Sequence, residues 1–152
     1  MEELITVLCN FGYTKEESKE ILNTYSLNAY KPETLKKKIE EMNAYMKKLG
    51  YSKEEVIKMA KSFPPIYSYN TDNIKQKIEH MKKLGYSKEE VIKMTKSLPA
   101  IYGYSIDNIK KKIEDMEKIG YSRAEVIKVT KSMPTIYGYS IDNIKQKIED
   151  ME

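Results

Sequence analysis

The sequence is poor in the residues that build most catalytic and metal sites. Its 152 residues include no tryptophan, one cysteine (Cys9) and one histidine (His80). A single cysteine excludes a disulfide framework within the chain. One cysteine and one histidine are also too few for a histidine and cysteine metal site, and no other unique nucleophile or base stands out. We therefore expect no enzyme activity: no catalytic residues, no metal and no cofactor.

Long apolar runs and targeting signals are absent as well. No stretch approaches the roughly 18 consecutive apolar residues of a membrane span. The N-terminus carries two acids, Glu2 and Glu3, where a signal or transit peptide has basic residues. The net charge of +4 is too small to attract nucleic acid by itself. These features predict a cytoplasmic protein with no membrane partner, in which a basic surface must arise from the arrangement of lysines on one face.

An internal repeat is the main feature of the chain. The tripeptide Gly-Tyr-Ser recurs every 35 residues, at Gly50, Gly85 and Gly120. The stretches 85–117 and 120–152 differ at only six of 33 aligned positions. A more divergent copy begins at Gly12 and contains about one extra helical turn near 42–45. We expect a single helical-repeat domain over 1–152, with units at 12–49, 50–84, 85–119 and 120–152, and with 1–11 as the tail of a preceding half-unit.

Each unit has the pattern of two helices joined by a proline-started turn. The first helix begins at a capping box, in which Ser87 and Glu90 satisfy each other's backbone amides. Apolar residues then recur at helical spacing until Pro99, which cannot continue a helix. A second helix begins at the cap Ser105 and ends at Gly120, because glycine readily adopts a left-handed conformation. The same capping box recurs at Thr14/Glu17, Ser52/Glu55 and Ser122/Glu125.

The segments between the paired helices, such as 99–104, suit a short 3₁₀ or α turn because proline is preorganised for a first helical position. Such a unit cannot bury its apolar faces alone and must stack on its neighbours. No segment alternates as a strand does. The sequence thus predicts an all-α fold, an α-solenoid (a right- or left-handed superhelix) of ~35-residue units.

The order of these signals resembles the mTERF repeat, named after the mitochondrial transcription termination factors. The resemblance rests on residues 84–94, on Pro99 and on the lysine-rich stretch 108–113, and it covers three units well and the first weakly. It implies a superhelical stack with a concave groove lined by basic residues, which binds double-stranded nucleic acid. The chain differs from the family in being shorter, in showing no organelle-targeting presequence and in having a single arginine, Arg123.

Two sets of recurring lysines are the candidate nucleic-acid-binding residues. On the first helix of a unit, two lysines three residues apart share one face. On the second helix, a lysine recurs and another follows two residues later. The first set is Lys58, Lys61, Lys93, Lys96, Lys128 and Lys131; the second is Lys75, Lys110 and Lys145, followed by Lys77, Lys112 and Lys147. Regular rows of ammonium groups suit duplex phosphates. The alternative interpretation is a solvated face that keeps the protein soluble.

Other recurring side chains have structural interpretations. The tyrosine pairs 67/69, 102/104 and 137/139 are expected to act as wedges between units, with the ring inside and the hydroxyl at the rim. Stacking of these rings on bases is the functional alternative. Asp107 and its counterparts Asp72 and Asp142 fit capping at a helix start. We expect His80 on the surface and Cys9 in the core.

The near-identity of the units argues against a repeat-by-repeat base code, because the reading positions of such a code must vary between units. We expect a duplex, double-stranded DNA by analogy, to be recognised by its backbone and shape. The alternative function is a protein-interaction scaffold that binds an acidic peptide or protein on the same face. The last unit stops before the closure seen at 118–120, so Ile144, Ile148 and Met151 are expected to be partly open. This end predicts self-association, or a place within a longer array.

Overall fold

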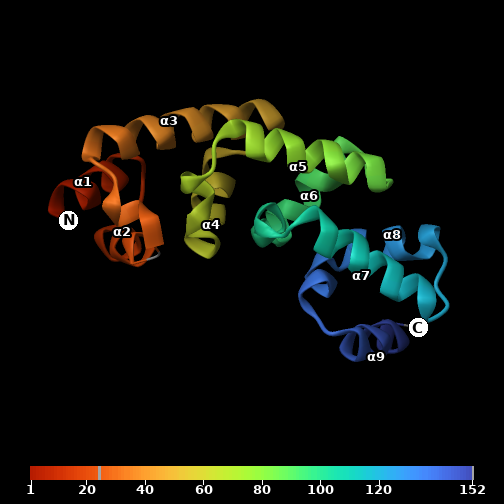
Figure 1. The fold of residues 1–152 in the computed structure, drawn as a ribbon. Helices are drawn as coiled ribbons and strands as arrows, with labels where there is room; N and C mark the ends of the chain where they lie inside the picture. The colour runs from red at the N-terminus through yellow and green to blue at the C-terminus, as the bar shows by residue number, and fades with distance from the viewer. Residues whose placement is uncertain (24, 152) are drawn as a thin grey trace. The chain divides into compact units, whose positions relative to one another are not determined.

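Helices are the only regular elements in the part of the chain that the computed structural model describes, residues 1–23 and 25–151 (Figure 1). Side chains are described throughout this part except at 25, 26, 147, 148 and 151. The α-helices are α1 (Glu2–Asn10), α2 (Lys15–Leu22), α3 (Pro32–Leu49), α4 (Lys53–Ser62), α5 (Thr71–Leu84), α6 (Lys88–Ser97), α7 (Ile106–Lys118), α8 (Arg123–Ser132) and α9 (Ile141–Met151). The 3₁₀ helices are η1 (Tyr25–Ala29), η2 (Pro64–Ser68), η3 (Pro99–Gly103) and η4 (Pro134–Gly138). The prediction of an all-α helical-repeat fold is confirmed.

The order of the elements follows the predicted unit. A short α-helix, a 3₁₀ helix and a second α-helix follow one another four times from α2 to α9, and α1 precedes the first set. Three of the 3₁₀ helices begin with a proline, at Pro64, Pro99 and Pro134. Helix α6 ends at Ser97, two residues before Pro99, because the residue before a proline is driven out of the helical conformation.

All four predicted capping boxes are present. At α6, the backbone N–H of Glu90 donates to Ser87 Oγ at 3.1 Å, and the N–H of Ser87 donates to Glu90 Oε1 at 2.7 Å. At α7, Ser105 Oγ accepts from the N–H of Asn108 at 3.1 Å. Asp107 lies in the first turn of α7, where a negative charge is favoured by the helix dipole.

The turn after α7 is a Schellman motif. Gly120 N–H donates to the carbonyl of Glu117 at 3.1 Å, and Tyr121 N–H donates to the carbonyl of Met116 at 3.3 Å. Gly120 has a φ of 115°, so the predicted left-handed conformation is confirmed. The glycines that end α1, α3 and α5 have positive φ as well. These motifs satisfy carbonyls that the helix end leaves without partners.

Packing divides the chain into two compact units, Met1–Gln76 and Lys77–Glu152, and the boundary falls inside α5. In the first unit, α1 packs on α2 and α3, while α4 packs on the same two helices and η2 contacts α3. In the second unit, α8 packs on α6 and α7, α9 packs on α7, and η4 contacts α6.

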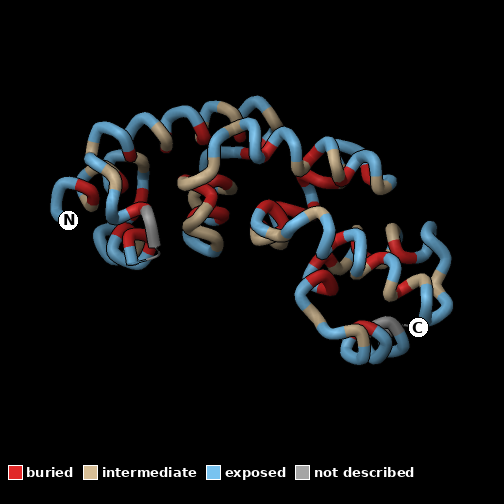
Figure 2. Tube along the Cα trace, in the orientation of Figure 1, coloured by how far each residue is buried: buried red, intermediate tan, exposed pale blue. Residues whose placement is uncertain are grey.

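Apolar side chains at helical spacing form the core of each unit (Figure 2). Helix α3 buries Leu35, Ile39, Met42 and Met46, and α7 buries Ile109, Ile113 and Met116. Each such side chain contributes roughly 1.5–3 kcal/mol to stability when it leaves water. The spacing of these residues places them on one face of each helix, so the second helix of a unit supplies a continuous apolar stripe.

Two expectations about single residues, Ile144 and Cys9, are wrong. Ile144 is fully buried, because α9 packs on α7; Ile148 and Met151 lie outside the residues whose side chains are described. Cys9 is exposed, since it follows the buried Leu8 and therefore points about 100° away from it around α1. His80 is half-exposed on α5, so it lies on the surface as expected.

Candidate nucleic-acid interface

Nine of the predicted lysines, those of the first helices together with Lys75, Lys110 and Lys145, lie on the surface, opposite the apolar stripes of their helices. In α6 the buried side chains are Val91, Ile92, Met94 and Thr95, whereas Lys93 points outward. Eight of the predicted lysines are exposed and one is half-exposed. The exposed ones are Lys58, Lys61, Lys75, Lys93, Lys96, Lys110, Lys128 and Lys145, and the half-exposed one is Lys131.

In the second unit, the structure brings three of these lysines into one cleft. Lys93 of α6 and Lys128 and Lys131 of α8 line a cleft of about 310 Å³, together with Glu90 and Ser132. Helices α6 and α8 belong to consecutive repeats and pack on each other. In this unit, lysines from the first helices of two consecutive repeats therefore line the same cleft.

The lysine at the end of each first helix has a structural partner. Lys131 Nζ lies 2.6 Å from Glu90 Oε2, and Lys61 Nζ lies 2.6 Å from Glu17 Oε2. The hydrogen bond from Lys131, followed by those from Ser87, lowers the pKa of Glu90 below its ordinary value. Glu90 thus caps its own helix with one oxygen and binds the following repeat with the other. Lys96 also has a partner within the chain.

Lys58, Lys93 and Lys128 differ from these residues, since none of them forms an ion pair in the described part of the chain. All three are exposed, so their ammonium groups remain available to an external anion. Two of them, Lys93 and Lys128, line the cleft described above. The first-helix set therefore separates into one lysine per repeat that is available and one that is engaged.

The second-helix lysines separate in the same way. Lys112 Nζ donates to the carbonyl of Tyr139 at 2.6 Å, and Lys77 Nζ donates to the carbonyl of Tyr104. Burial lowers the pKa of Lys77. The lysines two positions earlier, such as Lys110, point away from this contact, because two residues correspond to about 200° of rotation. Lys77 and Lys112 are thus structural, whereas Lys75, Lys110 and Lys145 are exposed. Lys147 lies outside the residues whose side chains are described.

The prediction that the first tyrosine of each pair keeps its hydroxyl at the rim is wrong. Tyr67 and Tyr137 are 0% and 6% exposed, and their hydroxyls lie 2.6 Å and 2.5 Å from those of Tyr13 and Tyr86. Burial raises the pKa of Tyr67 to about 12. The buried partner is the tyrosine that follows a repeat glycine, Tyr13 after Gly12 or Tyr86 after Gly85, and it lies 54 or 51 residues away. These rings are inaccessible to bases.

The second tyrosine of each pair is half-exposed. In the second unit, Tyr104 lines another cleft of about 470 Å³ together with Asn108, Lys111, Lys112 and Asp115. Sequence reasoning did not select Lys111. The signal that marks it is a difference from the repeats on either side, which have glutamine at this position, Gln76 and Gln146.

The single arginine is already engaged. Arg123 Nη2 lies 3.2 Å from Glu117 Oε1, an ion pair at the surface. Among the described residues, no group of three or more histidine, cysteine, aspartate or glutamate side chains is placed to hold a metal ion. A search of the same residues finds no helix with the length and apolar character needed to cross a membrane.

Comparison with protein families gives one match that spans nearly the whole chain. The family model, described as mTERF, matches residues 1–151. No match was found among curated proteins.

Proposed function

Since the chain belongs to the mTERF family, whose members are helical-repeat proteins that generally bind nucleic acids without catalysis, we propose that it binds double-stranded DNA. The contacts run from the lysines of the first helices to the phosphates. Lys58, Lys93 and Lys128 are the principal contacts. Lys75, Lys110 and Lys145 form the alternative set on the second helices.

The observation that supports this choice is the cleft between α6 and α8. Lys93 and Lys128 line it together, and neither forms an ion pair in the described part of the chain. Packed helices lie about 8–10 Å apart, and duplex DNA rises about 3.4 Å per base pair. Lysines on neighbouring first helices therefore match phosphates about three base pairs apart. By contrast, Lys75, Lys110 and Lys145 line neither this cleft nor the cleft beside Tyr104.

Recognition through backbone and shape fits the side chains that are present. Arginine is the residue best suited to read guanine, because its guanidinium forms two hydrogen bonds with one base edge. The one arginine of this chain is paired with Glu117. Lysine binds phosphate as a point charge, and phosphate contacts carry no sequence information directly. We therefore expect similar affinity for duplexes of different sequence.

The decisive measurement is the salt dependence of binding. Fluorescence anisotropy of a labelled mixed-sequence duplex gives the slope of log K against log salt concentration. Each phosphate contact contributes about 0.9 to this slope. The triple variant Lys58→Gln, Lys93→Gln, Lys128→Gln should therefore flatten the slope by about three and weaken all sequences alike. Circular dichroism should show an unchanged fold, since these side chains are exposed.

The matched control is the triple variant Lys75→Gln, Lys110→Gln, Lys145→Gln, which removes the same charge from the second helices. It should change the slope less than the first-helix variant. A larger effect of the control assigns the contacts to the second helices. If neither variant changes duplex affinity, or if no duplex binds at low salt, the proposal fails and an acidic peptide or protein becomes the partner to test. Equal binding of duplex RNA contradicts the choice of DNA alone.

A further inference from the structure

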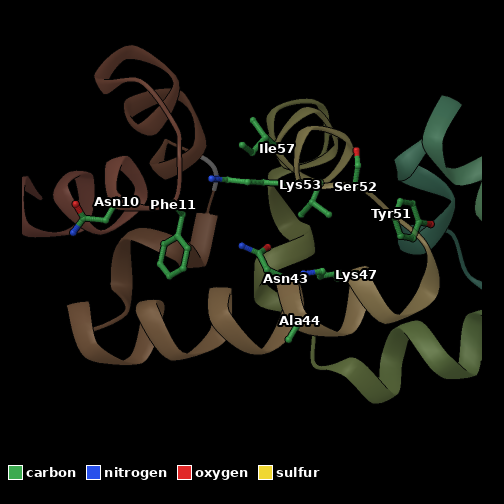
Figure 3. Close-up of a pocket in the computed structure, with 10 residues that line it drawn as sticks. Asn10, Phe11, Asn43, Ala44, Lys47, Tyr51, Ser52, Lys53 and Ile57 are labelled. Carbon is green, nitrogen blue, oxygen red and sulfur yellow. The ribbon is translucent and has the colours of Figure 1, made fainter.

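The first unit contains a pocket of about 380 Å³ that lies apart from the lysines discussed above (Figure 3). It lies between the end of α1, the C-terminal half of α3 and the start of α4. Phe11 comes from the turn after α1, Asn43 and Lys47 from α3, and Lys53 and Ile57 from α4. Figure 3 shows Phe11, Asn43 and Lys53 around the same space.

Two residues that line the pocket, Phe11 and Asn43, lie where the N-terminal part of the chain departs from the later repeats. Phe11 occupies the position that is Leu49, Leu84 or Ile119 before the other glycines. Asn43 lies in the extra helical turn, which makes α3 18 residues long against 14 for α5 and 13 for α7. Neither the phenylalanine nor the extra turn recurs at the matching positions of the later repeats.

The lining joins an apolar wall to a cationic rim. Phe11, Val56 and Ile57 supply the apolar wall, and Lys47 and Lys53 supply the cations. No acidic residue lines the pocket, and neither lysine forms an ion pair in the described part of the chain. The charge of the rim is therefore uncompensated.

Asn43 adds a hydrogen-bond donor to this rim. Its Oδ1 accepts from the hydroxyl of Tyr67 at 3.0 Å. That contact fixes the orientation of the side-chain amide, so its NH₂ group is left to donate elsewhere. The pocket thus offers one amide donor and two ammonium groups beside an aromatic ring.

We propose that this pocket binds a small molecule in which an aromatic or apolar body carries a single anionic head group. The volume lies in the range of small-molecule sites, about 300–1,000 Å³, and the pattern of an apolar wall with a few polar groups is typical of them. The body lies against Phe11 and Ile57, and Lys47, Lys53 and the amide of Asn43 bind the head group. None of the lysines proposed to contact DNA lines this pocket.

The test uses two fluorescent probes of similar shape. 8-Anilinonaphthalene-1-sulfonate carries an anionic group, and N-phenyl-1-naphthylamine is its neutral counterpart. The anionic probe should bind the full chain several-fold more tightly than the neutral one. The double variant Lys47→Gln, Lys53→Gln should weaken the anionic probe by roughly three- to tenfold, as expected for two exposed charge contacts, and leave the neutral probe unchanged.

The matched control is Lys82→Gln, Lys88→Gln, which removes two lysine charges at the corresponding positions of the next repeat, outside this pocket. It should leave both probes unchanged. In an NMR titration, the anionic probe should shift the amide signals of Phe11 and Lys53 and the side-chain NH₂ signal of Asn43. The proposal is overturned if the anionic probe does not bind, if the neutral probe binds equally well, if both double variants act alike, or if the shifted signals lie elsewhere.

Discussion

Replacing Gly120 by alanine isolates the energetic cost of a left-handed backbone in this repeat. Gly120 has a φ of 115°, at the second position of the turn that ends α7. A β-carbon built at Gly120 meets no atom within 4 Å. Steric contact with the rest of the protein therefore adds nothing, and the penalty comes from the backbone alone. For a residue with a β-carbon this penalty is about 1–2 kcal/mol.

Gly138→Ala provides the matched control. Gly138 lies in the same compact unit but is not among the positive-φ glycines, and a β-carbon there lies 3.5 Å from the hydroxyl oxygen of Tyr104, an ordinary contact. Alanine also restricts the unfolded chain more than glycine does. We therefore expect Gly138→Ala to be neutral or to stabilise the protein by up to about 1 kcal/mol.

Thermal and urea unfolding followed by circular dichroism measure the two effects. In a chain of 152 residues, 1 kcal/mol corresponds to about 2–4 °C in Tm. Gly120→Ala should thus lower Tm by about 2–8 °C, and Gly138→Ala should not lower it. Gly120→Asn should lie between Gly120→Ala and the wild type, because asparagine tolerates positive φ better than alanine. Equal unfolding free energies for the two alanine variants refute the reasoning.

Three further predictions concern contacts between repeats. Tyr137→Phe removes the hydrogen bond to the hydroxyl of Tyr86 and should lower the free energy of unfolding by about 1 kcal/mol in urea titrations; no change means that the buried pair is energetically neutral. Lys131→Gln removes the interaction that lowers the pKa of Glu90. The wild type should therefore be more stable than this variant above pH 4.5, the ordinary pKa of a glutamate, and the difference in unfolding free energy should disappear as the pH falls below that value. A difference that persists at pH 2 contradicts this. Lys112→Met loses a charge-assisted hydrogen bond to a carbonyl and should destabilise by about 1–2 kcal/mol, unlike the same change at the exposed Lys110.

Helix caps and turns could be predicted from the sequence because the residues that form them lie close together along the chain. The capping box joins Ser87 to Glu90, three residues away, and the turn at Gly120 joins residues no more than five apart. Such contacts form within one helical turn whatever surrounds them. The apolar spacing of Ile109, Ile113 and Met116 likewise identified the buried face of α7 before any packing was known.

The roles of individual lysines could not be read in this way. Lys128 and Lys131 lie three residues apart on one helix, and the sequence treats them as equivalent. The structure distinguishes them, because Lys131 reaches Glu90 in the preceding repeat and Lys128 reaches no acid in the described part of the chain. Which lysine forms the ion pair depends on how consecutive repeats pack, and no local sequence pattern encodes the distance between a lysine and the glutamate of the preceding repeat.

The sequence by itself therefore determined the helices, their caps, the short proline-started connections and the apolar face of each helix, since all of these arise from contacts within a few residues. Only the tertiary structure decided that the hydroxyls of Tyr86 and Tyr137 meet in the interior and that Phe11 and Asn43 border a pocket. Those arrangements join residues tens of positions apart. They form because a repeat buries its apolar face only against its neighbour, and that packing sets which polar groups come together.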